Sequence, residues 1–271
     1  MKARIVTGTL LALSIVGGVI YLPLALIALV LGSFLVVAAW EWAALSGWQS
    51  ASARISYTCL VAAFAIAVWH WNDAPGFFFY ASAVAVFWWS LSAVFVIFAQ
   101  QQKLGTRIRL ANNPAIGVLV LSCAWSSVVW LLCHDRTMLL GLFSIVWLAD
   151  AAAFFVGRRW GRRRLASNLS PGKSWEGAAG GLAFAAFGTL IFATTIELSG
   201  AASMAFLAVA IIAVCASIVG DLFESILKRN TGLKDSGQIL PGHGGVLDRI
   251  DGFVAAAPIF VVGLHGWVDR L

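Results

Sequence analysis

Charged side chains are scarce in this chain of 271 residues. Asp, Glu, Lys and Arg make up 11% of it, and hydrophobic residues make up 61%. A soluble chain carries roughly 25% charged residues. Residues 77–99 contain no charged residue, and a stretch of about 20 such residues is long enough to cross a bilayer. The scarcity of charge excludes an ordinary soluble domain and predicts an all-α, polytopic helix bundle in a membrane.

Cysteine is also scarce, and no CxxC pair is present. The four cysteines lie in or at the ends of apolar runs, where a free cysteine behaves as a small hydrophobic residue. The sequence therefore supports neither a disulfide framework nor a thiolate metal site. An internal repeat is not apparent either, which disfavours a transporter built from inverted repeats.

Apolar runs separated by short polar turns predict about nine membrane helices. The first two runs end near Tyr21 and Leu45, and the others cover residues 55–71, 77–99, 114–133, 137–157, 177–197, 202–227 and 252–268. A signal peptide is the alternative for the first run, because basic residues precede it. The next apolar run follows directly after Pro23, which favours a membrane helix. We expect one membrane domain, since no hydrophilic segment is long enough to fold alone.

The placement of Lys and Arg predicts the orientation. If the N-terminus is cytoplasmic, all of the 18 basic residues except Arg136 and Arg270 fall in inside segments. The positive-inside rule supports this alternation and places the loops 158–176 and 228–251 on the cytoplasmic side. The basic residues lie in connecting loops and not on one face, so the net charge of +6 does not indicate a nucleic-acid partner.

The charge that is present gathers between Asp221 and Asp251. This segment holds five of the 12 carboxylates and four of the 18 Lys and Arg residues. Asp221, Glu224 and Lys228 are spaced by three and four residues, so they share one face of a helix. Charge is costly near a bilayer, and a charged cluster beside apolar helices is a candidate functional site.

Two acidic helix ends are predicted to converge on a metal ion. Asp248 and Asp251 are three residues apart, just before the last predicted span. Carboxylate oxygens without Cys or His partners suit Mg²⁺, which binds through a few carboxylates and substrate phosphates. The predicted ligands are Asp221 and Asp248, with Glu224 and Asp251 as support. The alternative is that these acids form structural ion pairs with neighbouring basic residues.

Two loops are candidates for binding phosphate. Residues 241–245 read Pro-Gly-His-Gly-Gly, and backbone N–H groups in such a turn can form an anion-binding nest. A flexible turn is the alternative, but basic residues surround the loop. The residues predicted to bind phosphate here are Lys228, Arg229, Lys234, His243 and Arg249, and Asp235, Gly244 and Gly245 are predicted to bind the substrate.

The other loop, 158–176, carries five Arg residues before the run Ser170-Pro171-Gly172-Lys173-Ser174. The run is not a Walker A motif, because neither Ala166 nor Ser167 supplies the first glycine. Ser170 and Lys173 are still predicted to hold phosphate. The Arg cluster marks the orientation of the chain or contacts anionic lipid head groups.

Single acids also occur inside predicted spans. Asp150 lies on the inner half of the sixth span, where a carboxylate needs a partner. A ligand role and a hydrogen bond between helices are both open for it. Glu41 lies in the second span and is interpreted as an interfacial residue.

The C-terminal half of the chain resembles the phosphatidate cytidylyltransferases, the CDP-diacylglycerol synthases. One matching region is Gly220-Asp221-Leu222-x-Glu224-Ser225-x-Leu227-Lys228-Arg229-x4-Lys234-Asp235-x-Gly237-x2-Leu240-Pro241-x-His243-Gly244-Gly245-Val246-x-Asp248-Arg249-Ile250-Asp251. A second is Trp147-x2-Asp150, Gly157-Arg158, then Ser170-Pro171-Gly172-Lys173-Ser174-x-Glu176-Gly177 and Gly180-Gly181. Ala151-Ala152 departs from the pattern, which has Ser or Gly there. The resemblance covers residues 147–251, and the N-terminal spans match only in character.

The resemblance implies a membrane enzyme that makes CDP-diacylglycerol and pyrophosphate from CTP and phosphatidic acid with Mg²⁺. It implies N-terminal helices in 1–136 and a catalytic region in 137–271, with Asp150 and Glu176 as supporting residues. A second cation and a homodimer are left open. The expected location is the bacterial inner membrane, with the site on the cytoplasmic side and membrane lipids as partners. A CTP-dependent lipid kinase, an enzyme for another lipid phosphate and an anion transporter are the alternatives.

Overall fold

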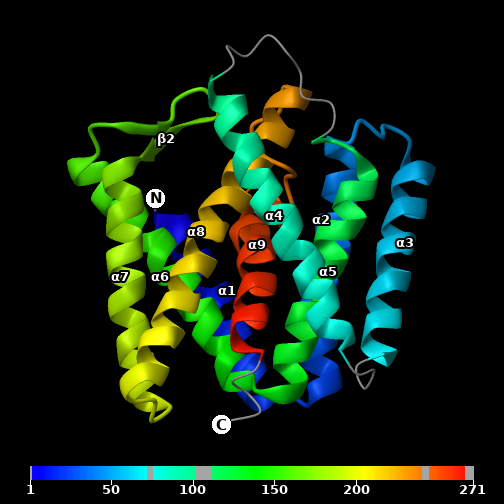
Figure 1. Ribbon diagram of the computed structural model, residues 1–271. Helices are drawn as coiled ribbons and strands as arrows, with labels where there is room; N and C mark the ends of the chain where they lie inside the picture. Colours follow the sequence, from blue (N-terminus) through cyan, green and yellow to red (C-terminus); the bar gives the residue numbers. More distant parts are fainter. Residues whose placement is uncertain (1, 72–75, 102–110, 240–243, 266–271) are drawn as a thin grey trace.

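The computed structural model describes residues 2–71, 76–101, 111–239 and 244–265. Within these residues the chain forms nine helices and one β-hairpin (Figure 1). The helices are α1 Lys2–Tyr21, α2 Leu24–Leu45, α3 Ala51–His70, α4 Phe77–Gln101, α5 Pro114–His134, α6 Arg136–Trp160, α7 Trp175–Thr195, α8 Gly200–Thr231 and α9 Leu247–Leu264. The strands are β1 Arg164–Ala166 and β2 Ser170–Ser174.

The predicted all-α membrane bundle is confirmed. Seven of the described helices, α2 to α8, are long and apolar enough to cross a membrane. The two exceptions lie at the ends of the chain. In α1 the apolar part is Gly8–Tyr21, and α9 carries charged side chains in its first two turns. The protein is therefore an integral membrane protein.

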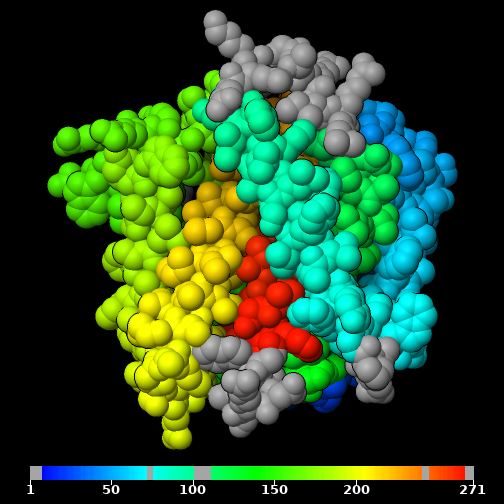
Figure 2. Space-filling model, viewed as in Figure 1, coloured from blue at the N-terminus to red at the C-terminus, as the bar shows by residue number. Residues whose placement is uncertain are grey.

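Helix α9 lies at the centre of the bundle. It packs against α8, α4 and α5 and also contacts α2 and α6. The run Ala255–Ala257 is fully buried, which lets neighbouring helices approach closely. Figure 2 shows α9 as a narrow strip between α8 and α4. Because α9 is surrounded by other helices, the charged side chains at its start are held inside one end of the bundle.

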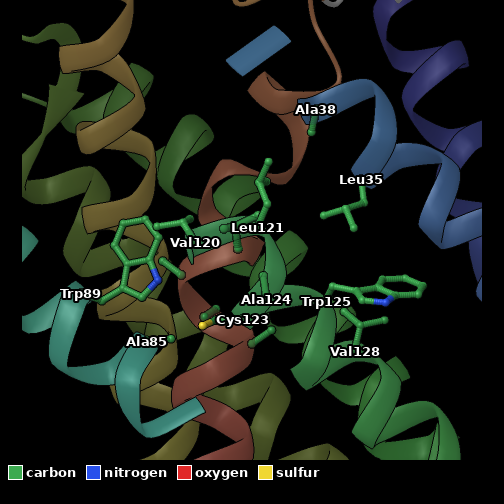
Figure 3. Close-up of a cluster of buried hydrophobic side chains, with 14 of the residues drawn as sticks. Leu35, Ala38, Ala85, Trp89, Val120, Leu121, Cys123, Ala124, Trp125 and Val128 are labelled. Carbon is green, nitrogen blue, oxygen red and sulfur yellow. The ribbon is translucent and has the colours of Figure 1, made fainter. Parts of the chain in front are cut away.

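The main apolar core surrounds α5. Most of this helix is buried, and side chains of α2 and α4 pack against it (Figure 3). The indole nitrogen of Trp125 donates a hydrogen bond of 3.0 Å to the carbonyl oxygen of Ala65 in α3. Helix α5 also packs against α9, so the N-terminal helices pack directly on the C-terminal ones.

The hairpin β1–β2 was not predicted, because its residues show neither apolar alternation nor a common turn sequence. The Glu176 carboxylate accepts hydrogen bonds from the backbone N–H groups of Arg162 and Arg163, at 3.0 and 3.2 Å. Ser174 caps α7 by accepting from the N–H of Gly177. Glu176 and Ser174 thus tie the hairpin to the start of α7.

Helix α8 is longer than predicted. The apolar run ends near residue 227, but the helix continues to Thr231 and stops at Gly232, which has a φ of +73°. Figure 1 places this end of α8 and the hairpin at the same end of the bundle. The charged residues of α8 are therefore presented on a rigid helix and not on a loop.

We expect Gly220→Ala to destabilise the fold. A Cβ atom there would collide with the carbonyl oxygen of Asp251 and lie 2.9 Å from the Cβ atom of Ala255. Overpacking of this kind costs about 1–3 kcal/mol, so the midpoint of thermal unfolding in detergent should fall. Gly17→Ala is the control, since a Cβ atom at Gly17 meets nothing within 4 Å. Equal midpoints for both variants would contradict the close approach of α8 and α9.

Candidate active site

A cavity of about 1510 Å³ opens between the hairpin and helices α6, α8 and α9. One part of its wall is charged, and its charged side chains include Asp150, Lys173, Asp221, Asp248, Arg249 and Asp251. Another part is apolar and comes from α1, α2, α5 and α6, with Leu35, Trp125, Phe143 and Trp147 among its residues. The same space can therefore receive a highly charged group and a hydrocarbon group.

An ion pair joins the hairpin to helix α8. Strand β2 carries Lys173, and the nitrogen of its side chain lies 2.5 Å from Oδ2 of Asp221 in α8. The two side chains are 26% and 37% exposed. An ion pair with this much exposure contributes only about 0–1 kcal/mol to stability. The two groups can therefore exchange partners at little cost when a ligand enters.

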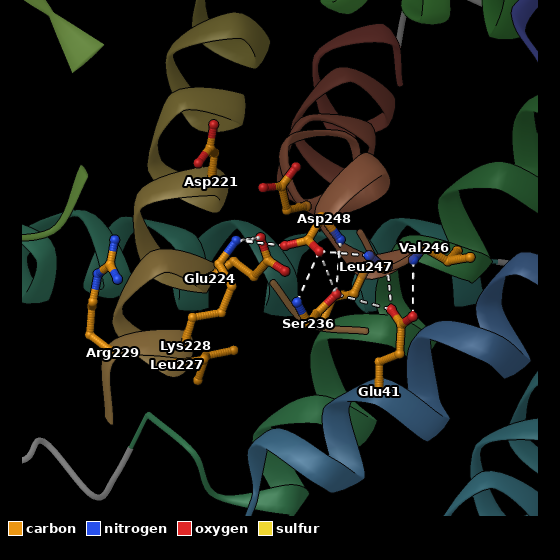
Figure 4. Close-up of polar contacts among 12 residues, drawn as sticks. Glu41, Asp221, Glu224, Leu227, Lys228, Arg229, Ser236, Val246, Leu247 and Asp248 are labelled. Carbon is orange, nitrogen blue, oxygen red and sulfur yellow. Dashed lines mark hydrogen bonds and ion pairs between the residues drawn. The ribbon is translucent and has the colours of Figure 1, made fainter. Parts of the chain in front are cut away.

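A second lysine lies deeper and holds two acids (Figure 4). The Nζ atom of Lys228 donates to Glu224 at 2.9 Å and to Asp248 at 2.7 Å. All three side chains are at most 13% exposed. Lys228 thus joins α8 to the start of α9 and compensates charge that would otherwise be costly to bury.

The Asp248 carboxylate also organises the glycine-rich turn. Its Oδ2 atom accepts hydrogen bonds from the N–H of Gly245 at 2.8 Å and the N–H of Ser236 at 2.9 Å. Gly244 has a φ of +82°, and a Cβ atom there would lie 2.8 Å from Oδ2. Burial alone would raise the pKa of Asp248, but the hydrogen bonds from Lys228, Gly245 and Ser236 keep that pKa below its ordinary value. Asp248 is therefore an anion at neutral pH.

Glu41 is part of the same network, so its interpretation as an interfacial residue is wrong. Its side chain is 1% exposed and accepts hydrogen bonds from the N–H groups of Val246 and Leu247. The hydroxyl of Ser236 also donates to it, at 3.1 Å. Neither Glu41 nor Ser236 was predicted as part of the site. The available signal was a single acid in an apolar helix, which requires a polar partner.

The chain is similar to known proteins over nearly its whole length. The family model of the cytidylyltransferase family matches residues 2–266. A Pseudomonas aeruginosa protein named phosphatidate cytidylyltransferase is 39% identical over 98% of both chains. A protein of the same name from Haemophilus influenzae is 31% identical over 96% of this chain and 97% of its own. One from Bacillus subtilis is 42% identical over 42% of each chain.

The chain belongs to the cytidylyltransferase family. The resemblance expected from the sequence is therefore confirmed.

The donor chemistry of the cavity fits the divalent cation that the cytidylyltransferase family uses. Asp150, Asp221 and Asp251 line one cavity, and their hard oxygens suit such an ion. The Oε1 atom of Glu224 is buried and makes no hydrogen bond within the described part of the chain. Among the described residues, no three His, Cys, Asp or Glu side chains are already grouped as a metal site. The cavity therefore fits a divalent cation by the type of its donor atoms.

The structure gathers most of the site residues predicted for this cytidylyltransferase. Of these, the cavity is lined by Ser170, Lys173, Asp221, Asp248, Arg249, Asp251 and Asp150. Glu224, Lys228, Gly244 and Gly245 lie in the network directly behind it. Their roles stay predictions.

Other predicted residues lie elsewhere. The guanidinium of Arg229 donates to the carbonyl oxygen of Leu169, at 3.4 Å, on the turn between the strands. Lys234 and Asp235 are exposed, and neither is among the described residues that line the cavity. Glu176 holds the hairpin. His243 lies outside the described residues.

Proposed function

We propose that this protein transfers the cytidylyl group of CTP to phosphatidic acid and so makes CDP-diacylglycerol and pyrophosphate. The observation that carries the proposal is the cavity, whose wall is charged in one part and apolar in another. A nucleotide triphosphate needs the first part, and a lipid needs the second. Relatives of nearly the same length carry the name of this activity.

The proposed reaction is a direct displacement. A phosphate oxygen of phosphatidic acid attacks the α-phosphorus of CTP, a new P–O bond forms, and the bond to the β-phosphate breaks to release pyrophosphate. A phosphate monoester is already largely ionised near neutral pH, so the attack needs no strong base. Positioning and neutralisation of charge supply most of the catalysis.

The side chains of the cavity suit these tasks. Lys173 and Arg249 are cations beside the space for the triphosphate, and we assign them to phosphate binding. Lys228 keeps Asp248 and the turn at Gly244 and Gly245 in place directly behind the cavity wall. Ser170 lines the cavity on the hairpin side and completes the phosphate contacts.

We assign the cation-binding role to Asp221 and Asp248, with Glu224 and Asp251 as support, and Mg²⁺ as the ion. When bound, Mg²⁺ neutralises negative charge on the phosphates. Asp221 is more accessible than the other two ion-paired acids of the site, Glu224 and Asp248, because its side chain is 37% exposed. The proposed location is the bacterial inner membrane, with this end of the bundle in the cytoplasm.

The fate of labelled CTP tests the proposed reaction. Purified protein in vesicles containing phosphatidic acid should incorporate the α-phosphate label of CTP into lipid and leave the γ-phosphate label in water. A lipid kinase would give the opposite distribution. An anion transporter would move solute without consuming CTP.

Lys173→Ala should lower kcat/KM for CTP by about 10²-fold, since it removes a charge that contacts the phosphates. Arg159→Ala is the matched control, because Arg159 is exposed on the same side of the protein and is not among the described lining residues. Steady-state rates over a range of CTP concentrations give the measurement. Equal kcat/KM values for the two variants would remove Lys173 from the site.

A further inference from the structure

Helix α9 begins without a capping side chain of its own. Its N-cap residue, Val246, makes no side-chain cap hydrogen bond. The first N–H groups of a helix have no partner within the helix, and a buried helix start needs acceptors for them. Glu41 of α2 supplies these acceptors from more than 200 residues away in the sequence. Its Oε1 atom accepts from Val246 at 3.1 Å, and its Oε2 atom accepts from Leu247 at 2.7 Å.

Ser236 connects this cap to Asp248. The Oγ atom of Ser236 lies 3.1 Å from Oε2 of Glu41 and 3.0 Å from Oδ2 of Asp248. One hydroxyl carries one proton, so at any moment it donates to one of the two carboxylates. The N–H of Asp248 in turn donates to this Oγ atom at 3.3 Å. A change at Glu41 therefore reaches Asp248 through one bridging atom.

Two glycines, Gly237 and Gly245, lie against the Glu41 carboxylate. A Cβ atom at Gly245 would collide with Oγ of Ser236 and lie 2.6 and 2.7 Å from the two oxygens of Glu41. A Cβ atom at Gly237 would also collide with Glu41. Only glycine leaves room for the Glu41 carboxylate at these two positions. The turn is thus built around a side chain from the N-terminal half of the chain.

We propose that Glu41 is a positioning residue for cytidylyl transfer. It holds the start of α9 and, through Ser236, the orientation of Asp248 and of the turn at Gly244 and Gly245. It does not line the cavity among the described residues, so it acts through these groups and not on the substrate. The inference rests on the proposed function, because its first readout is the rate of that reaction.

Glu41→Gln keeps the size of the side chain but replaces one acceptor oxygen with an N–H₂ donor. In either orientation of the amide, that donor would face a backbone N–H group at the start of α9, from Val246 or from Leu247. Groups that orient a catalytic ligand typically contribute 10- to 100-fold. We therefore expect kcat to fall by about 10- to 100-fold, with a smaller change in KM for CTP. Glu41→Asp, which keeps the charge, should recover part of the loss.

Hydrogen–deuterium exchange separates positioning from a general loss of structure. In Glu41→Gln, peptides that contain Val246 and Leu247 should exchange faster, whereas peptides from α5 should exchange as in the unchanged protein. Equal exchange at the start of α9 in both proteins would overturn the proposal. Faster exchange throughout the bundle would also overturn it, because Glu41 would then be a general stability residue.

Ser236→Ala provides a second test and decides the question if Glu41→Gln does not fold. It removes only the bridging hydroxyl, and we expect kcat to fall by about 10-fold, the lower end of the range for groups that orient a ligand. The double variant should lose less than the product of the two single losses, since part of the effect of Glu41 passes through the Ser236 hydroxyl. Independent, multiplicative effects would break the proposed link, as would an unchanged kcat in Ser236→Ala. Absence of transfer by the unchanged protein would instead refute the proposed function.

Discussion

Asp221→Asn should lower kcat/KM for cytidylyl transfer by about 10²- to 10³-fold. The amide has the shape of the carboxylate but no charge, so it can neither pair with Lys173 nor serve as a strong ligand for Mg²⁺. The protein should still fold, because the Lys173–Asp221 pair is partly exposed and contributes at most about 1 kcal/mol. Rates at saturating phosphatidic acid and varied Mg²⁺ give the measurement, and raising Mg²⁺ should restore only part of the activity.

Glu197→Gln is the matched control for this variant. Glu197 is an exposed acid between α7 and α8, at the other end of the bundle (Figure 1). Its removal changes the net charge of the protein by the same amount without touching the cavity. Loss of a group that stabilises developing charge lowers kcat/KM by more than about tenfold. If Asp221→Asn keeps more than about a tenth of the kcat/KM of Glu197→Gln, Asp221 is therefore not a metal ligand.

Lys228→Met should have the largest effect on stability. The lysine compensates Glu224 and Asp248, and among the described residues no other cation lies within hydrogen-bonding distance of the buried Glu224 carboxylate. Breaking a buried ion pair by removing one partner costs about 3–5 kcal/mol. The free energy of unfolding, measured by denaturant titration in detergent, should fall by that amount. Lys234→Met, at an exposed position, is the stability control.

A double variant shows whether the loss comes from uncompensated charge. Glu224→Gln combined with Lys228→Met removes both partners, and such replacements are often close to neutral. Asp248 keeps its hydrogen bonds from Ser236 and Gly245 in this variant. Stability should therefore largely return, while activity stays low because Asp248 is no longer held by Lys228. A double variant as unstable as Lys228→Met would contradict this account of the network.

The helices could be predicted because each depends on a continuous local pattern. The predicted runs that end near Leu45 and at residue 133 stop at polar turns, and the helices α2 and α5 end at Leu45 and His134. The far end of α8 could not be placed in this way. Its last turn is polar and is held by contacts with α9 and the hairpin, such as Lys228 with Asp248.

The residues of the site can also be divided into those that a local sequence pattern predicts and those that it does not. Asp221, Glu224 and Lys228 follow one helical spacing, so their common face could be predicted, and a resemblance linked them to Asp248. Glu41 could not be linked to them, because no local pattern connects residues two hundred positions apart. The hairpin was missed for a similar reason: the Glu176 carboxylate holds its first residues, and that contact has no signal in the sequence.

The central claim is that one cavity joins a nucleotide to a lipid, and release of pyrophosphate tests it most directly. Purified protein in vesicles should release pyrophosphate from CTP only when phosphatidic acid and Mg²⁺ are both present, in an amount equal to the CDP-diacylglycerol formed. Release that does not require phosphatidic acid, or no release with both substrates present, would contradict the claim.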